Sequence, residues 1–327
     1  MKIIAEIGFN HGGDMDDAVA MIRAAAAAGA DIVKFQTFRA TDILRPDSPY
    51  VEAIRPGELD LARHRLLKAE AEARGVGFLS TPFSPDGVDL LEEAGVDAYK
   101  VASMDVTNLP LLGRVAATGK PVYLSTGMAV LGEIDLALET LAAHGAGEVS
   151  LLHCLSQYPA RAEDLHLSAI GLLRDAFGLP VGYSDHYPGI DACLAAYFHG
   201  ARIIETHFTL DVGREGGDHA HSADPAMLRR LCDGLALFEA MEGNAAAFFR
   251  RRPDRENARL FRRGLHAARD IRAGEVVARE DLLSCRPEGE LSPADLDWVV
   301  GLRARRDVKA LGPVSRNDFL DASATRP

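Results

Sequence analysis

Apolar and polar positions follow one another along this chain as a regular series of short and long segments. Short apolar runs rich in β-branched residues predict strands, and the longer Ala- and Leu-rich stretches between them predict helices. The predicted strands are Ile3–Ile7, Ile32–Phe35, Gly77–Ser80, Ala98–Val101, Pro121–Ser125, Val149–His153, Pro180–Tyr183 and Arg202–Thr206. The predicted helices are Asp16–Ala28, Leu59–Arg74, Asp86–Ala94, Glu133–Ala143, Leu167–Phe177, Ile190–His199 and Pro225–Met241.

Eight strands that alternate with helices predict an α/β fold, a closed parallel (β/α)₈ or TIM barrel. Glycines stand where several helices would end, which is typical of helix C-caps: Gly29, Gly75, Gly95, Gly200 and Gly243. An open doubly wound sheet is disfavoured, because the turn after the first strand lacks the glycine spacing of a dinucleotide-binding loop.

The pattern changes after Gly243, and we predict three parts: a barrel over 1–244, a connecting arm over 245–262 and a small β-rich domain over 263–327. The last part repeats itself, which predicts two pseudo-symmetric halves. The repeated segments are Arg269–Ala273 with Arg306–Ala310, and Val277–Leu282 with Val314–Phe319.

The composition of the 327-residue chain is ordinary for a globular protein, with 47% hydrophobic and 26% charged residues. A net charge of −12 argues against a nucleic-acid partner. No apolar run has the length of a membrane span and the first residues lack a signal-peptide pattern, so we expect a cytoplasmic protein. The cysteines form no CxxC pair and are expected to be reduced, mostly buried thiols: Cys154, Cys193, Cys232 and Cys285.

Polar residues stand at the carboxyl ends of all the predicted strands, where barrels of this kind carry their active sites. A barrel with a purely structural role would not need them, so they predict an enzyme. The candidates are Glu6, Asn10, His11, Lys34, Gln36, Thr81, Lys100, Ser103, Ser125, Ser156, Tyr158, Ser184, His186, Glu205 and His207, with Asp218 in a later loop.

Lys34 and Lys100 lie within apolar strands, where an unpaired ammonium group is costly to bury. Each lysine could pair with a carboxylate, or the two could form a pocket for an anion. Hydroxyl groups at Ser103, Ser125 and Thr126 favour the pocket, with a phosphate or carboxylate group as its ligand.

His186 and His207 end adjacent strands, so their imidazoles can converge on one divalent metal ion. The alternative is a pair of hydrogen-bonded structural histidines. Carboxylates expected nearby favour the metal: Glu6, Asp185, Glu205 and Asp218. His219 and His221 are either further ligands or residues of a glycine-rich lid.

The motifs at the strand ends resemble those of the sialic acid synthase family, in order over nearly the whole chain. They are Ala5–Gly13, Val33–Gln36, Tyr99–Ser103, Ser125–Met128, Gly182–His186, Glu205–Asp211 and Gly217–His219. The tail, Arg269–Leu282 with Arg286-Pro287, resembles the antifreeze-like domain (SAF, of the β-clip type) that closes such synthases. The combination is highly specific, although each short motif alone is weak.

The resemblance implies that phosphoenolpyruvate condenses with an open-chain N-acetylated sugar of the mannosamine type, to give a nonulosonic (sialic-type) acid and phosphate. It implies that His186 and His207 hold a divalent metal, Mn²⁺ or else Mg²⁺ or Co²⁺, which polarises the sugar aldehyde. It also implies catalytic roles for Glu6, Glu205 and Asp218 in handling water, protons and sugar hydroxyls.

The same resemblance implies a phosphoenolpyruvate site at Lys34, Lys100, Ser103, Ser125 and Ser184. The remaining expected substrate-binding residues are Gln36, Thr81, Ser156, Tyr158 and Arg286. In the family the C-terminal domain of one subunit covers the barrel of its partner, and its arginine reads the N-acyl group. We therefore expect a domain-swapped homodimer.

The chain departs from the family pattern where we expect the sugar to be chosen: Leu155, Thr206, Gly217, His221 and the acidic segment Glu288–Glu290. One alternative is therefore the same condensation on a diacetamido-trideoxyhexose, giving legionaminic or pseudaminic acid. Another is a different metal-dependent TIM-barrel aldolase or hydrolase. A third is a catalytically inactive sugar-binding or polymer-assembly protein.

Overall fold

The computed structural model describes residues 1–250 and 254–319, and the chain divides into two compact units, Met1–Glu242 and Gly243–Pro327. The first unit contains one parallel sheet in the order β3-β2-β1-β8-β7-β6-β5-β4, and β3 contacts β4 to give a nearly closed barrel. Its strands are β1 (Lys2–Gly8), β2 (Ile32–Thr37), β3 (Gly77–Pro82), β4 (Tyr99–Val101), β5 (Val122–Ser125), β6 (Val149–Cys154), β7 (Val181–Asp185) and β8 (Ile203–His207). All eight predicted strands are present, and the predicted fold class is confirmed.

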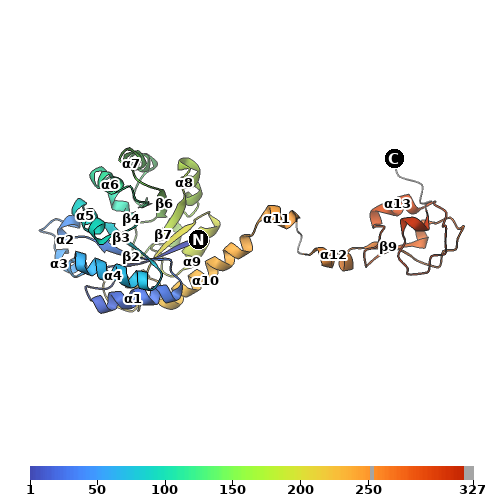
Figure 1. The fold of residues 1–327 in the computed structure, drawn as a ribbon, viewed down its shortest axis with the longest axis horizontal. Coiled ribbons are helices and arrows are strands. Elements are labelled where there is room, and N and C mark those ends of the chain that lie inside the picture. Colours follow the sequence, from blue (N-terminus) through green and yellow to red (C-terminus); the bar gives the residue numbers. More distant parts are fainter. Residues whose placement is uncertain (251–253, 320–327) are drawn as a thin grey trace. The chain divides into compact units, whose positions relative to one another are not determined.

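Helices surround the strands of this unit (Figure 1). The longer ones are α1 (Met15–Ala28), α4 (Leu61–Ala73), α5 (Pro85–Ala94), α6 (Leu109–Ala116), α7 (Leu131–Ala143), α8 (Ala169–Phe177), α9 (Asp191–Phe198) and α10 (Pro225–Glu242). The short α2 (Ala40–Ile43) and α3 (Val51–Ile54) follow β2. No helix in the described part of the chain is both long enough and apolar enough to cross a membrane.

Helix α1 shows how local sequence sets the limits of an element. The Asp14 side chain accepts hydrogen bonds from the backbone amides of Asp16 and Asp17, which caps the helix N-terminus. Gly29 ends the helix with a φ of 101°, a left-handed conformation that favours glycine.

Helix α6 was not predicted, although its N-terminal signal is present in the sequence. Asn108 caps it by accepting a hydrogen bond from the amide of Leu111, and Pro110 stands in its first turn. The helix has eight residues and contains Gly113, so its apolar repeat is too short to stand out.

Side-chain alternation along the strands separates the hydrophobic core from the polar end of the barrel. In β1, Ile3, Ala5 and Ile7 belong to the core between strands and helices, whereas Ile4 joins a small cluster inside the barrel. Glu6 points the same way as Ile4, one step nearer the carboxyl end. The barrel interior is thus apolar around Ile4 and charged toward the carboxyl ends of the strands.

The second unit begins with two short helices, α11 (Ala245–Arg250) and α12 (Arg255–Phe261), in the segment predicted as an arm. The antiparallel strands β9 (Gly264–Ala267) and β10 (Leu282–Cys285) follow, with α13 (Leu296–Val299). They share a separate hydrophobic core that includes Leu265, Ile271, Leu291, Val308 and Val314. The predicted arm and domain also include 251–253 and 320–327, which lie outside the described residues.

The repeated segments of the second unit have matching contacts. Arg269 Nε donates to Asp281 Oδ1 over 2.7 Å, and Arg306 Nε donates to Asp318 Oδ1 over 2.5 Å. Both aspartates are buried, and each also accepts a hydrogen bond from a backbone amide three residues before it. The two repeated segments therefore share the same Arg–Asp contact, which is consistent with the predicted pseudo-symmetric halves.

Candidate active site at the carboxyl ends of the strands

A cavity of about 390 Å³ lies at the carboxyl ends of the barrel strands. Apolar side chains that the sequence did not single out line part of it: Phe9, Phe83, Met104 and Met128, together with Cys154. Fourteen of the fifteen residues predicted to bind metal or substrate or to act in catalysis line it as well. These are Glu6, Lys34, Gln36, Thr81, Lys100, Ser103, Ser125, Ser156, Tyr158, Ser184, His186, Glu205, His207 and Asp218.

A larger cavity, of about 680 Å³, is lined by residues from the loops that follow β1, β2 and β3. Its arginines already have partners: Arg39 lies 3.5 Å from Asp86, Arg55 lies 4.0 Å from Glu58, and Arg63 donates to the Glu58 carbonyl oxygen over 3.2 Å. None of the predicted site residues lines it. The smaller cavity is therefore the candidate active site.

Two lysines and two glutamates meet at the base of this site. Lys34 Nζ lies 2.7 Å from Glu6 Oε2 and 3.7 Å from Glu205 Oε1, and Lys100 Nζ lies 3.6 Å from Glu205 Oε1. All four side chains are buried, and Gln36 Nε2 donates to Glu6 Oε1 over 3.0 Å. Each lysine thus has a carboxylate partner, which was the first of the two alternatives. Both lysines also line the cavity, where an anion could reach them. The second alternative, an anion pocket, therefore stays a prediction.

The two glutamates differ in their proton affinity. Burial raises the pKa of the Glu6 carboxyl, and the nearby Glu205 charge adds to this, against the effect of Lys34. Burial acts in the same direction on Glu205, but Lys100 and Lys34 outweigh it and lower the pKa of that carboxyl. Glu205 therefore stays ionised between the lysines, whereas Glu6 is the better group for exchanging a proton.

Hydroxyl groups surround the lysines. Ser184 Oγ donates to Glu205 Oε1 over 3.2 Å, and Ser103 Oγ accepts from the amide of Gly127 over 3.0 Å. The Oγ atoms of Ser125 and Ser156 are buried and have no hydrogen-bond partner among the described residues. Buried hydroxyls without partners, beside two ammonium groups, are suited to binding the oxygens of an anion.

His186 and His207 follow one another around the barrel, at the ends of β7 and β8, and their ring centroids lie 5.2 Å apart. His186 Nδ1 lies 2.7 Å from the Leu155 carbonyl oxygen and donates to it, which leaves Nε2 with its lone pair. His207 Nδ1 lies 3.4 Å from Asp218 Oδ2. The Tyr158 ring lies against His186, tilted by 43°, with 4.0 Å between ring centroids.

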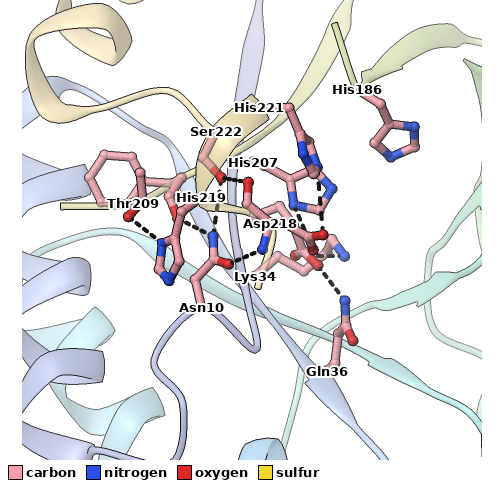
Figure 2. Close-up of polar contacts among 12 residues, drawn as sticks. Asn10, Lys34, Gln36, His186, His207, Thr209, Asp218, His219, His221 and Ser222 are labelled. Atoms are coloured by element: carbon pink, nitrogen blue, oxygen red, sulfur yellow. Dashed lines mark hydrogen bonds and ion pairs between the residues drawn. The ribbon is translucent and has the colours of Figure 1, made fainter. Parts of the chain in front are cut away.

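Asn10, which follows β1 near the start of the chain, positions the Asp218 backbone. Asn10 Nδ2 donates to the Phe208 carbonyl over 3.0 Å, and Asn10 Oδ1 accepts from the Asp218 amide over 2.8 Å (Figure 2). Gly217 has a φ of +52°, and a Cβ there would lie 2.8 Å from Asn10 Oδ1. Asn10, predicted as a group of the site, thus holds the loop backbone rather than lining the cavity, and His11 likewise lies outside the lining.

The structure separates the two histidines whose roles the sequence left open. His219 Nδ1 lies 2.7 Å from Thr209 Oγ1, and its ring points away from His207 in Figure 2. His221 lies beside His207, with 5.0 Å between ring centroids, and its Nε2 is 3.6 Å from Asp218 Oδ1. Of this pair, His221 belongs to the site.

A divalent metal ion fits these residues. Ligand atoms of His207, Asp218 and His221 all lie within 4.8 Å of one another. His207 Nδ1 and His221 Nε2 are buried without a hydrogen-bond partner among the described residues, and burial lowers the pKa of both imidazoles. Neutral imidazole nitrogens beside a carboxylate oxygen are a typical donor set for such an ion. Binding by the predicted pair, His186 and His207, stays a prediction.

Two expectations about sugar-facing residues need correction. Thr206 does not line the cavity: it lies between Glu205 and His207 in β8, so its side chain points to the other side of the strand, near Cys193. The Leu155 side chain packs against the hydrophobic core, and only its carbonyl oxygen serves the site, by fixing His186. Neither departure from the family pattern contacts the cavity through its side chain.

Arg286, the remaining predicted site residue, belongs to the second unit. Its guanidinium carbon lies 5.1 Å from the centre of the Phe261 ring. Its expected role in reading an N-acyl group stays a prediction.

A parallel barrel with buried acids, bases and imidazoles gathered at the carboxyl ends of its strands has the architecture of a TIM-barrel enzyme. Residues 21–247 match the NeuB family model, and residues 262–320 match the SAF domain. The chain belongs to the NeuB family of nonulosonic acid synthases, and it is an enzyme, a transferase that forms carbon–carbon bonds. The resemblance to sialic acid synthases is thereby confirmed.

The chain is similar to several named members over most of its length. It is 38% identical to the N,N'-diacetyllegionaminic acid synthase of Campylobacter jejuni, over 94% of this chain and 96% of that protein. It is 34% identical to the human N-acetylneuraminate-9-phosphate synthase, over 74% of this chain and 71% of that protein. A crystal structure of the N-acetylneuraminic acid synthetase of Leptospira borgpetersenii, with citrate, superposes with a TM-score of 0.72 at 37% identity, over 74% of this chain and 85% of that one.

Proposed function

We propose that this enzyme condenses phosphoenolpyruvate with an open-chain N-acetylated amino sugar of the mannosamine type, releasing phosphate and a nonulosonic acid. The observation that carries the proposal is the convergence of fourteen predicted residues on one cavity. That cavity brings together two lysines and several serines suited to an anion, a carboxyl group suited to proton transfer, and two imidazoles beside a carboxylate that suit a divalent ion. The names of the similar synthases support a product of this class.

Phosphoenolpyruvate would bind beside the two lysines. Its phosphate and carboxylate oxygens would accept hydrogen bonds from the serine hydroxyls. Two ammonium groups and the unpartnered hydroxyls of Ser125 and Ser156 can stabilise several anionic oxygens in a buried site. Glu205, held between the lysines, favours the protonated form of both: the pKa of Lys34 is raised, and Glu205 opposes the burial that lowers the pKa of Lys100.

The reaction forms one carbon–carbon bond. C3 of phosphoenolpyruvate attacks the aldehyde carbon of the sugar, and the aldehyde oxygen takes up a proton. C2 gains positive character, water adds to it, and the bond from C2 to the phosphate oxygen breaks to leave the keto acid and phosphate. Glu6 would accept the proton of that water, a role that suits a carboxyl whose pKa is raised by burial. A divalent ion bound at His207 and its neighbours would polarise the aldehyde.

A second acceptor is favoured by one observation. The match to a diacetyllegionaminic acid synthase extends over nearly the whole chain at 38% identity, which supports a diacetamido-trideoxyhexose as the sugar. The 37% identity to an N-acetylneuraminic acid synthetase supports the simpler mannosamine type over a smaller part of the chain, 74%. We further propose that the enzyme works as a domain-swapped homodimer in which Arg286 of one subunit reads the N-acyl group of the sugar.

The proposal is tested by phosphate release from phosphoenolpyruvate, with Mn²⁺, against a panel of N-acetylated and diacetamido hexoses. We expect release only with an amino sugar, and no release from His186→Ala or His207→Ala. Lys100→Met should raise the KM for phosphoenolpyruvate by about tenfold or more, with little change in the KM for the sugar. Full activity of a histidine variant in chelator-treated buffer would contradict the metal assignment, and equal effects of Lys100→Met on both KM values would contradict the anion pocket.

A further inference from the structure

Three imidazole rings, rather than two, lie close together at the candidate metal site: His186 and His207 line the cavity, and His221 lies beside His207. The ring centroids of His186 and His207 lie 5.2 Å apart, those of His207 and His221 lie 5.0 Å apart, and those of His186 and His221 lie 6.4 Å apart. Imidazoles that share one ion through metal–nitrogen bonds of about 2.1 Å have ring centres about 5 Å apart. His221 is therefore as well placed relative to His207 as His186 is.

The His221 ring nitrogen also lacks a protein partner. His221 is only 6% exposed, and its Nε2 atom is buried with no hydrogen-bond partner among the described residues. The nearest carboxylate oxygen, Asp218 Oδ1, lies 3.6 Å away, which is too far for a hydrogen bond. A buried polar atom without a partner is costly, and a bound cation would supply that partner.

The backbone holds His221 in this position. It lies in the single turn η4 (His219–His221), where the His221 amide donates to the Asp218 carbonyl over 3.3 Å. Ser222 Oγ donates to the same carbonyl over 2.8 Å and accepts from Asn10 Nδ2 over 3.1 Å. Asn10 thus ties the turn to β1, so Asp218 and His221 reach the site together (Figure 2).

We propose that His221 is a direct ligand of the metal ion together with His207 and Asp218, the three residues whose ligand atoms all lie within 4.8 Å of one another, and that His186 completes the site as in the proposed function. The inference rests on the metal site of the proposed function and deepens it. Three nitrogen donors and one carboxylate bind borderline ions such as Co²⁺, Fe²⁺ and Zn²⁺ more tightly than Mn²⁺ or Mg²⁺. An ion of coordination number six keeps two positions for the substrate, so the additional ligand is compatible with catalysis.

The test measures metal binding by the full-length protein without substrates, by titration of the metal-free protein with Co²⁺ and with Mn²⁺. His221→Ala should weaken Co²⁺ binding by about 10- to 100-fold, weaken Mn²⁺ binding less, and change the visible absorption spectrum of bound Co²⁺. The matched control is His219→Ala, which removes an equally buried imidazole from the same turn, one bound to Thr209 instead. It should leave Co²⁺ affinity and spectrum unchanged.

Unchanged Co²⁺ affinity and spectrum in His221→Ala would overturn the proposal, as would equal losses in both variants, which would indicate a loosened turn. If His221→Ala does not fold, pulsed electron paramagnetic resonance of the Mn²⁺-loaded wild-type and His186→Ala proteins decides: two coupled imidazole nitrogens remaining in His186→Ala support the ligand role, and a single one refutes it. Loss of binding in His207→Ala but not in His221→Ala would remove this inference alone. Unchanged binding in His186→Ala, His207→Ala and His221→Ala would remove the metal site of the proposed function as well.

Discussion

At the scale of single residues, the site contains two glutamates whose surroundings shift their pKa values in opposite directions. Glu6 and Glu205 are both buried, and both contact Lys34. Only Glu205 has a second ammonium group near it, that of Lys100, and this difference keeps Glu205 ionised while the pKa of Glu6 is raised. The two proposed roles, Glu6 as the base and Glu205 as the ionised group between the lysines, therefore follow from the surroundings of each side chain and not from the residue type.

Glu6→Gln tests this division. The amide keeps the shape of the side chain but cannot accept a proton, so we expect turnover to fall by about 100-fold or more. Circular dichroism and the melting temperature show whether the barrel is intact. Glu163→Gln, at an exposed position, serves as the control and should be unaffected. Turnover of Glu6→Gln within a factor of about three of wild type would show that Glu6 carries no proton in the slow step.

His11 is expected to make the barrel sensitive to acid. It is buried, its Nδ1 accepts a hydrogen bond from the amide of Gly13 over 3.1 Å, and burial lowers its pKa to about 4. The unfolded chain binds the proton at pH values below about 6.5 and the folded chain does not, so stability falls as the pH drops from about 6.5 to about 4. The loss is about 1.4 kcal/mol per pH unit for this one group.

Urea unfolding at several pH values measures this slope. His11→Gln, which cannot be protonated, should lower the slope by the contribution of one proton, whatever its effect on stability at neutral pH. An unchanged slope in the variant would contradict the account of His11.

At the scale of elements, the strands and their polar ends could be predicted, because period-two alternation and carboxyl-end position are local properties. The expectation that Thr206 faces the sugar was wrong. Side chains alternate along β8, so Thr206 must point away from the cavity that Glu205 and His207 line. The contact of Asn10 with the Asp218 turn joins residues 208 positions apart, and no local pattern reveals it. The position of His221 beside His207 depends on that same contact.

The loop after β5 gives a prediction at this scale. Gly127 lies against the serine hydroxyls, and a Cβ there would come within 2.6 Å of Ser156 Oγ and 2.9 Å of Ser103 Oγ. Gly127→Ala should therefore displace these hydroxyls and raise the KM for phosphoenolpyruvate by about tenfold. The matched control is Gly132→Ala in α7, where a Cβ meets no atom within 4 Å. Steady-state kinetics that do not distinguish the two variants would contradict the placement of the serines.

At the scale of the whole molecule, the chain consists of two units with separate hydrophobic cores. The barrel core is formed by side chains of residues 1–242, and the small domain has its own core. The repeat within the small domain and the change in pattern after Gly243 could be read from the sequence.

A truncated protein ending at Asn244 tests the role of the second unit. Because the barrel has a complete core, we expect it to fold, with helix content that circular dichroism can measure. Its KM for phosphoenolpyruvate should change little, whereas its KM for the sugar should rise by about tenfold or more, because Arg286 is lost. Kinetics equal to those of the full-length protein would remove the proposed lid.

The central claim is that this cavity joins phosphoenolpyruvate to an N-acetylated amino sugar. The most direct measurement is the mass of the product together with the amount of phosphate, after the metal-loaded full-length protein has acted on phosphoenolpyruvate and N-acetylmannosamine or its diacetamido-trideoxy counterpart. We predict one phosphate per molecule of product, and a product mass equal to sugar plus phosphoenolpyruvate plus water minus phosphoric acid. Phosphate release that does not depend on the sugar, or a sugar recovered unchanged with every acceptor, would contradict the claim.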